Sequence, residues 1–452
     1  RHLDGQADSD GVERRLDGTG FEPLLHQNAY TGGLEYTQRF GDGRYNLEVK
    51  LFGSTVHGSA EAIDLTQRAS QHYFQRPGAD YLDYDPTRTH LEGLGAQLFL
   101  GGNWGKHWRA AIGGDTRTPG FEANDLGFQR QADMTLTWLW AEYRDETPST
   151  YVRSYSISVN PWEVFTYRPA QVGAGGTLAA NVVFPNYYSA QGGVNLEFNA
   201  LSPGALRGGP ELRDDFSLNG WLGAESDGRK KLSGNLEGNV TRQPASDSHS
   251  YSVSVGANLQ AASNLRVGLG TFFRAEKNDR QYVAELSDPN GMPHYVLARI
   301  AQDTVGLTMR ADYTVTPKLS VQAYAQPFVT AGAYTRYKEV DAPVAEPYAD
   351  RFHVYGAGEF SQMNGIVSVD RDQNGIVDFS FSRPDFSFRE LSSIVVLRWE
   401  YLPGSTLFAV WSHGRTSLAP DGAFRLGHDL SELGRADGEH VFLAKLTYWF
   451  GT

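Results

Sequence analysis

The sequence of 452 residues has no cysteine, no excess of basic residues and no long apolar run. Without cysteine there is no disulfide framework, no thiolate zinc site and no cysteine nucleophile. Asp and Glu outnumber Lys and Arg by 53 to 40, a net charge of −13, so nucleic acid is not an expected partner. No stretch approaches the ~18 consecutive apolar residues that a membrane-spanning helix needs. These absences exclude helical membrane proteins and nucleic-acid-binding proteins.

The chain is instead rich in glycine and aromatic residues. It has 50 Gly, 24 Phe, 23 Tyr and 9 Trp, although its mean hydropathy is only −0.43. The aromatic residues occur over the whole length, which argues against a coiled coil or a disordered tail. This composition is typical of a strand-rich protein.

Long segments alternate between apolar and polar residues, the period of a β-strand. Such runs last about ten residues or more, longer than the usual ~5–6 of a globular strand. In a soluble sandwich the apolar face is hidden inside, whereas in a membrane barrel it faces lipid and the polar face lines the lumen. One of the clearest runs places Val305, Leu307, Met309, Ala311, Tyr313 and Val315 on one face.

The connections between these runs distinguish the two architectures. Eight short turns are predicted, and longer polar connections lie between them. Short turns at one end and long loops at the other are expected of outer-membrane barrels, with the short turns periplasmic. The short turns are predicted at 40–44, 104–107, 145–150, 185–188, 226–230, 261–264, 316–318 and 402–405, and the main long connections at about 56–88, 116–130, 277–303, 336–390 and 416–438.

Eight turns join sixteen strands, and the alternating C-terminal segment that ends at Phe450 adds one more. Because bacterial single-chain barrels have an even number of strands, one further strand is expected in residues 1–25 or upstream. We therefore predict an all-β, transmembrane antiparallel β-barrel of about 18 strands, between roughly 16 and 20, over residues 26–452. Residues 1–25 are interpreted as a linker or first strand, with an N-terminal module missing upstream.

Several segments together resemble a known family. They are 121–133, 206–210, 226–230, 324–328 and 398–401, followed by Gly404, Ser405 and Phe408. From about residue 90 to the end, the chain resembles the C-terminal barrel of an uncharacterised bacterial envelope family, usually preceded by a family-9-type carbohydrate-binding module. The resemblance implies an outer-membrane barrel of unknown activity and supplies no catalytic residue.

The segment 370–378 has the spacing of a calcium-binding loop. Alternate oxygen ligands can converge on one hard cation, and Gly375 stands where such a loop turns sharply. Position twelve is Phe381 and not the bidentate Glu of an EF-hand, so a dockerin-like loop is the closer comparison. The alternative is a polar surface turn that binds nothing. The predicted Ca²⁺ ligands are Asp370, Asp372, Asn374, the carbonyl of Ile376, and Asp378.

Two further sets of side chains are candidates for the barrel interior. Charged residues predicted to face the lumen could shape ion selectivity or merely neutralise one another. Trp138, Trp140 and Tyr143 could stack on sugars, but their alternation with Leu139 and Ala141 favours a lipid-facing girdle. The charged set consists of Glu237, Arg266, Arg310, Asp312, Arg398, Glu400 and Lys445.

No catalytic motif is present. The His residues form no metal-binding pair, no nucleophile elbow or phosphate loop is found, and the adjacent Asp214 and Asp215 are interpreted as ordinary loop acids. We predict a bacterial outer-membrane protein that is not an enzyme and acts as a channel, uptake pore or surface scaffold. The alternatives are a plugged barrel for surface binding or assembly and a soluble secreted carbohydrate-active enzyme. Expected partners are outer-membrane lipid and lipopolysaccharide, the barrel-assembly machinery, and an oligosaccharide or another envelope protein.

Overall fold

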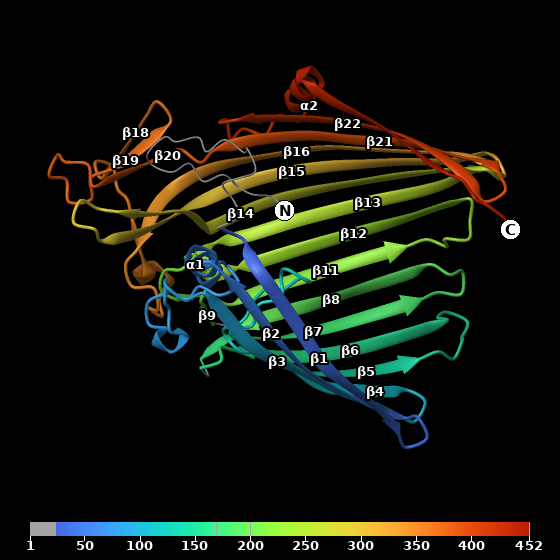
Figure 1. Ribbon diagram of the computed structural model, residues 1–452, viewed down its shortest axis with the longest axis horizontal. Helices are drawn as coiled ribbons and strands as arrows, with labels where there is room; N and C mark the ends of the chain where they lie inside the picture. The colour runs from blue at the N-terminus through green and yellow to red at the C-terminus, as the bar shows by residue number, and fades with distance from the viewer. Residues whose placement is uncertain (1–23, 169, 199, 452) are drawn as a thin grey trace.

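The computed structural model describes residues 24–451, except 169 and 199, and it is built around one large antiparallel sheet. The sheet has 18 strands, of which the three-residue β17 (Phe352–Val354) pairs only with the tip of β16. The other 17 strands form the wall of a β-barrel, with neighbouring strands nearly always consecutive in the chain (Figure 1). The predicted all-β barrel architecture is confirmed.

The wall strands follow one another around the barrel in chain order. They are β1 (His26–Phe40), β2 (Tyr45–Gly58), β3 (His90–Trp104), β4 (Trp108–Arg117), β5 (Met134–Asp145), β6 (Ser154–Phe165), β7 (Gln171–Val183), β8 (Ser189–Phe198), β11 (Ser217–Glu225), β12 (Leu232–Gln243), β13 (Ser248–Ala262), β14 (Leu265–Ser287), β15 (Pro293–Thr316), β16 (Leu319–Val340), β21 (Phe386–Leu402), β22 (Ser405–Ala419) and β23 (Gly438–Thr447).

The two faces of the wall differ as the alternation predicts. One face exposes aliphatic side chains such as Leu139, Ile157 and Leu222. The other face carries Trp162, which lines a cavity together with residues 70–76 of the loop between β2 and β3. Because that loop folds over this second face from another part of the wall, the second face is the inner one. The aliphatic face is therefore the outer surface, as expected for a barrel in lipid.

A row of aromatic rings lies on the outer face beside the short turns. The Phe40 and Tyr45 rings are 5.3 Å apart, and Tyr45 is 5.7 Å from Trp104. Further along, Trp108 and Tyr143 are 5.2 Å apart. Such a row is typical of the interfacial girdle of a membrane barrel. The girdle interpretation is thus right for Tyr143.

All eight predicted short turns connect successive strands, and they lie together at the right-hand end of the strands in Figure 1. The long connections are less well predicted. Residues 277–303 were expected to be a loop, but β14 and β15 continue through them and leave only 288–292 between the strands. At the loop end, the connection between β12 and β13 is also short, whereas the long connection between β8 and β11 was not predicted.

The loop end carries additional small elements around its own apolar clusters (Figure 1). One cluster lies between the extended tips of β14–β16 and a three-stranded sheet, and includes Tyr337 and Val367. No helix in the described part of the chain is long and apolar enough to cross a membrane. The small elements are α1 (Ala60–Arg68), η2 (Asp80–Leu82), β9 (Leu201–Ser202), β10 (Leu212–Arg213), η3 (Pro244–Ser246), η4 (Tyr348–Arg351), β18 (Phe360–Met363), β19 (Ile366–Val369), β20 (Phe379–Ser382) and α2 (Leu426–Arg435).

Strands β1 and β23 are the two edges of the wall. Among the described residues, β1 pairs only with β2, and β23 pairs only with β22. The further strand predicted in or before residues 1–25 lies outside the described residues.

Candidate functional site

The loop between β2 and β3 is fixed to its neighbours by buried polar contacts. It enters α1 through Ser59, whose hydroxyl caps the helix by accepting from the Ala62 amide at 3.0 Å. Its buried His72 contacts the Glu122 carboxylate through Nε2 and the Pro119 carbonyl through Nδ1, both at 2.9 Å. These contacts join the loop to the connection between β4 and β5.

A second buried contact joins the same two loops. The Arg76 guanidinium donates to the Asp133 carboxylate at 2.7 Å, and the Tyr81 hydroxyl donates to the same oxygen at 2.7 Å. The other Asp133 oxygen accepts from the Tyr167 amide, which lies just after β6. A single buried carboxylate therefore connects three separate loop-end segments.

Burial and hydrogen bonding set the pKa values of these loop groups. Burial and the hydrogen bond to Asp133 together raise the pKa of the Tyr81 hydroxyl to about 12. For the Glu122 carboxyl, burial raises the pKa, but hydrogen bonds from His72 and from the Asn124 amide outweigh it. The net result is a lowered pKa, so Glu122 stays ionised at neutral pH.

The connection between β8 and β11 continues these contacts toward the far side of the wall. Gly208 lies against the Gln75 side chain of the first loop. The neighbouring Arg207 guanidinium lies 4.5 Å above the Tyr282 ring of β14. Because β2–β3 and β14 are far apart around the sheet, the chain crosses the mouth of the barrel here.

The strongest link in this region is a buried ion pair. The Arg351 guanidinium donates to both Asp215 oxygens, at 2.8 and 2.9 Å, and the two side chains are only 0% and 9% exposed. It also donates to the Arg213, Ala345 and Glu346 carbonyls. The adjacent Asp214 pairs with Arg280. Of these two loop acids, Asp215 is therefore a buried structural carboxylate, whereas Asp214 is 40% exposed.

A buried carboxylate also connects the extended tips of β14, β15 and β16. Asp279 accepts from Lys338 and from Arg299, each at 2.6 Å, and from the Tyr348 hydroxyl at 2.8 Å. We call residues 59–88, 118–133, 200–216 and 341–355, with these strand tips, the loop cap. The ion pairs described above, Arg76–Asp133, Arg351–Asp215 and Lys338–Asp279, are buried, so they fasten these segments into one cover.

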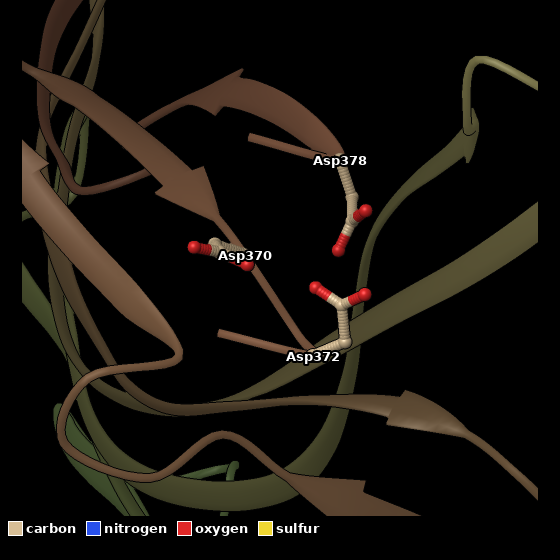
Figure 2. A group of neighbouring side chains, drawn as sticks. All are labelled: Asp370, Asp372 and Asp378. Carbon is tan, nitrogen blue, oxygen red and sulfur yellow. The ribbon is translucent and has the colours of Figure 1, made fainter. Parts of the chain in front are cut away.

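The predicted calcium loop lies outside the loop cap core, between β19 and β20. Figure 2 shows the carboxylates of Asp370, Asp372 and Asp378 turned toward one another, and their ligand atoms lie within 4.8 Å of each other. Gly375 has a φ of +88°, the left-handed conformation that the sharp turn requires. The structure thus brings together three of the five predicted ligands.

The other two predicted ligands are arranged differently. The Asn374 side-chain oxygen accepts from the Ile376 amide at 2.8 Å, and its nitrogen donates to Asp372 at 2.8 Å. The Ile376 carbonyl was the other predicted ligand, and its role stays a prediction. The Asn374 side chain would have to rotate before its oxygen could join the three carboxylates, and calcium binding stays a prediction.

The charged set predicted for the lumen lies on the inner face, opposite the exposed aliphatic side chains. Arg266 and Asp312 are register partners, and the guanidinium of Arg398 lies 3.6 Å from the Glu400 carboxylate. Trp138 and Trp140 share the inner face with Arg109 and Glu142, whose charged groups are 3.6 Å apart. For these two tryptophans, the lipid-facing interpretation is wrong.

Residues 55–451 match a protein family described as a domain of unknown function, DUF5916. The chain belongs to the DUF5916 family. The match begins earlier than residue 90, where the resemblance was placed, and covers nearly the whole barrel wall. A preceding family-9-type carbohydrate-binding module stays a prediction for this DUF5916 chain.

Comparison with other proteins gives only remote likenesses for the DUF5916 chain. No curated protein matches it. A bacterial polysaccharide outer membrane secretin is 10% identical with a TM-score of 0.31, and the alignment covers 78% of this chain and 89% of that one. The ferric enterobactin receptor of Pseudomonas aeruginosa is 8% identical with a TM-score of 0.41, covering 93% of this chain and 70% of that one. Likeness at this level does not relate individual residues.

Proposed function

We propose that the protein is a bacterial outer-membrane β-barrel whose outer mouth is closed by its own loops. It would act as a binding or assembly protein and not as an open pore. The aliphatic outer face and the aromatic girdle beside the short turns support the placement in an outer membrane. The short turns would then lie in the periplasm and the loop cap outside the cell.

The loop cap is the observation that supports closure. A mobile surface loop would keep its charged groups in water, but Arg351, Asp215, Arg76 and Asp133 are all buried and paired. Charged groups are buried only where partners compensate for the lost hydration. The cap is therefore a folded cover and not a set of loops that happen to be near one another.

Single-channel recording in a planar bilayer tests this proposal. Detergent-purified protein that shifts on a gel when boiled is expected to insert without steady openings. Deleting residues 63–86 from the loop between β2 and β3 removes the segment that carries His72 and Arg76, and should produce long-lived openings. Steady openings of nanosiemens scale in the intact protein would contradict closure and favour the channel or uptake pore.

A further inference from the structure

Four aromatic side chains lie close together on the inner face of the wall. Trp138 of β5 and Trp162 of β6 are register partners, so their side chains lie side by side on the same face. Trp140 lies two residues further along β5, and the Phe99 ring of β3 is 6.0 Å from that of Trp138. We call Phe99, Trp138, Trp140 and Trp162 the inner aromatic row.

Glycine residues allow two of these rings to lie flat against the wall. A Cβ atom at Gly113 would stand 2.4 Å from the Trp138 ring, and one at Gly175 would stand 2.6 Å from the Trp162 ring. Both distances are too short for a real contact, so only glycine fits beneath each ring. The two rings therefore lie against bare backbone, and each lines a hollow on the inner face.

Members of the inner aromatic row line two hollows. One, of about 460 Å³, lies under the loop cap and is lined by Trp162, Tyr73 and Arg76. The other, of about 450 Å³, lies nearer the short turns and is lined by Phe99, Trp138 and Trp140. Trp138 and Trp162 are register partners, so the aromatic side chains that line the two hollows are neighbours on the wall.

The hollow nearer the short turns is lined by arginines, and the carboxylates of Glu48 and Glu142 contact its lining residues Asn46 and Arg109. Arg39, Arg44 and Arg109 line it, and no Asp or Glu does. Arg109 has only a 3.6 Å contact with Glu142, and Arg44 uses its Nε to donate to the Gly41 carbonyl. Within the described part of the chain, the Arg39 guanidinium has no hydrogen-bond or ion-pair partner. Guanidinium groups are therefore available for an anionic ligand.

We propose that this surface binds an acidic oligosaccharide. The C–H groups of a sugar ring are electropositive and are attracted to the negative face of an aromatic ring, so a row of neighbouring aromatic rings suits a sugar chain. Sugar carboxylates or sulfates suit the arginines, since guanidinium groups bind such anions through paired hydrogen bonds. Asn103 in the same hollow can hydrogen-bond to hydroxyl groups. This proposal goes beyond closure of the barrel and does not depend on it.

Titration calorimetry of the detergent-purified full chain tests the proposal, with a galacturonic acid hexamer and a glucose hexamer as probes. The acidic hexamer should bind saturably and the neutral one at least tenfold more weakly. Trp138→Ala should weaken acidic binding at least tenfold, while Trp138→Phe, which keeps an aromatic face, should weaken it less than threefold. Arg39→Ala should remove most of the preference for the acidic probe. Trp104→Ala, in the outer girdle, is the matched control and should not change binding.

Absence of saturable binding of the acidic hexamer would overturn the proposal, as would equal binding by folded Trp138→Ala. Equal affinity for the two hexamers would overturn the acidic assignment. Heat modifiability on a gel shows whether each variant is folded. Conductance is measured separately, so failure of this proposal is distinguishable from failure of the closed barrel.

Discussion

Arg351 is the residue whose loss should open the loop cap most strongly. Its guanidinium makes five hydrogen bonds, two to Asp215 and three to backbone carbonyls. In Arg351→Ala the Asp215 carboxylate remains buried without its cation. Removing one partner of a buried ion pair costs about 3–5 kcal/mol. The cap should therefore open far more often, while the barrel wall stays folded.

Limited proteolysis measures this opening. When opening and closing are faster than cleavage, the cleavage rate follows the population of the open form. Because about 1.4 kcal/mol corresponds to a factor of ten, the lost stability should raise cleavage within residues 341–355 by roughly two to four orders of magnitude. The heat-dependent gel shift of the barrel should be unchanged.

Arg435→Ala provides the matched control. Arg435 pairs with Glu432 at 2.8 Å, but its side chain is 75% exposed, and an exposed pair contributes little. The loop cap of Arg435→Ala should be cleaved at the same rate as the loop cap of the unmodified protein. If Arg351→Ala also cleaves within twofold of that rate, the cap does not depend on the buried pair, and our account of a rigid cover is wrong.

Three further predictions concern other parts of the molecule. If the 370–378 loop binds calcium, about 1 mM Ca²⁺ should slow its proteolysis, and Asp372→Asn should remove the effect; no change on adding calcium would refute the prediction. The lowered pKa of Glu122 means that its stabilising effect is present above the unfolded carboxyl pKa of about 4.3 and is lost as the pH falls through the lower folded value. Hydrogen exchange of the residues around position 122, corrected for intrinsic rates, should increase as the pH falls. The increase should be less steep in Glu122→Gln than in the unmodified protein. Leu139→Arg on the outer face should lower the free energy of unfolding in lipid vesicles by about 2–4 kcal/mol, and Ser158→Arg on the inner face by much less.

The wall and the short turns were predictable because their signals are local. Alternation within one strand needs only neighbouring residues, and a tight turn is recognised from a few residues such as Pro403 and Gly404. The clustering of Asp370, Asp372 and Asp378 was predictable for the same reason, since they lie within nine residues of one another. The side-chain arrangement of this loop was not predictable, because Asn374 forms bonds within the loop that the spacing does not reveal.

The loop cap was not predictable because its partners are distant in sequence. Arg351 and Asp215 are separated by 136 residues, and Lys338 and Asp279 by 59. The inner aromatic row was missed for another reason. In β5 both alternating sets contain large apolar residues, Leu139 in one and Trp138 and Trp140 in the other, so polarity does not identify the lipid face. Arg109 and Glu142 on the inner side were the available signal, but their pairing depends on the β4–β5 register.

The strand number determines how the barrel can close. With 17 antiparallel wall strands in the described part of the chain, the edges β1 and β23 run in the same direction. Unpaired edges in lipid would cost several kcal/mol for each unsatisfied backbone group. One more strand between them would be antiparallel to both, and a strand joined to β1 by a hairpin has that direction. We therefore expect an eighteenth strand between the two edges, outside the described residues. Because the chain has no cysteine, single cysteines in β1 and β23 can test this: with a strand between the edges, none of the edge-to-edge pairs should form a disulfide, and an efficient disulfide would instead indicate direct parallel closure.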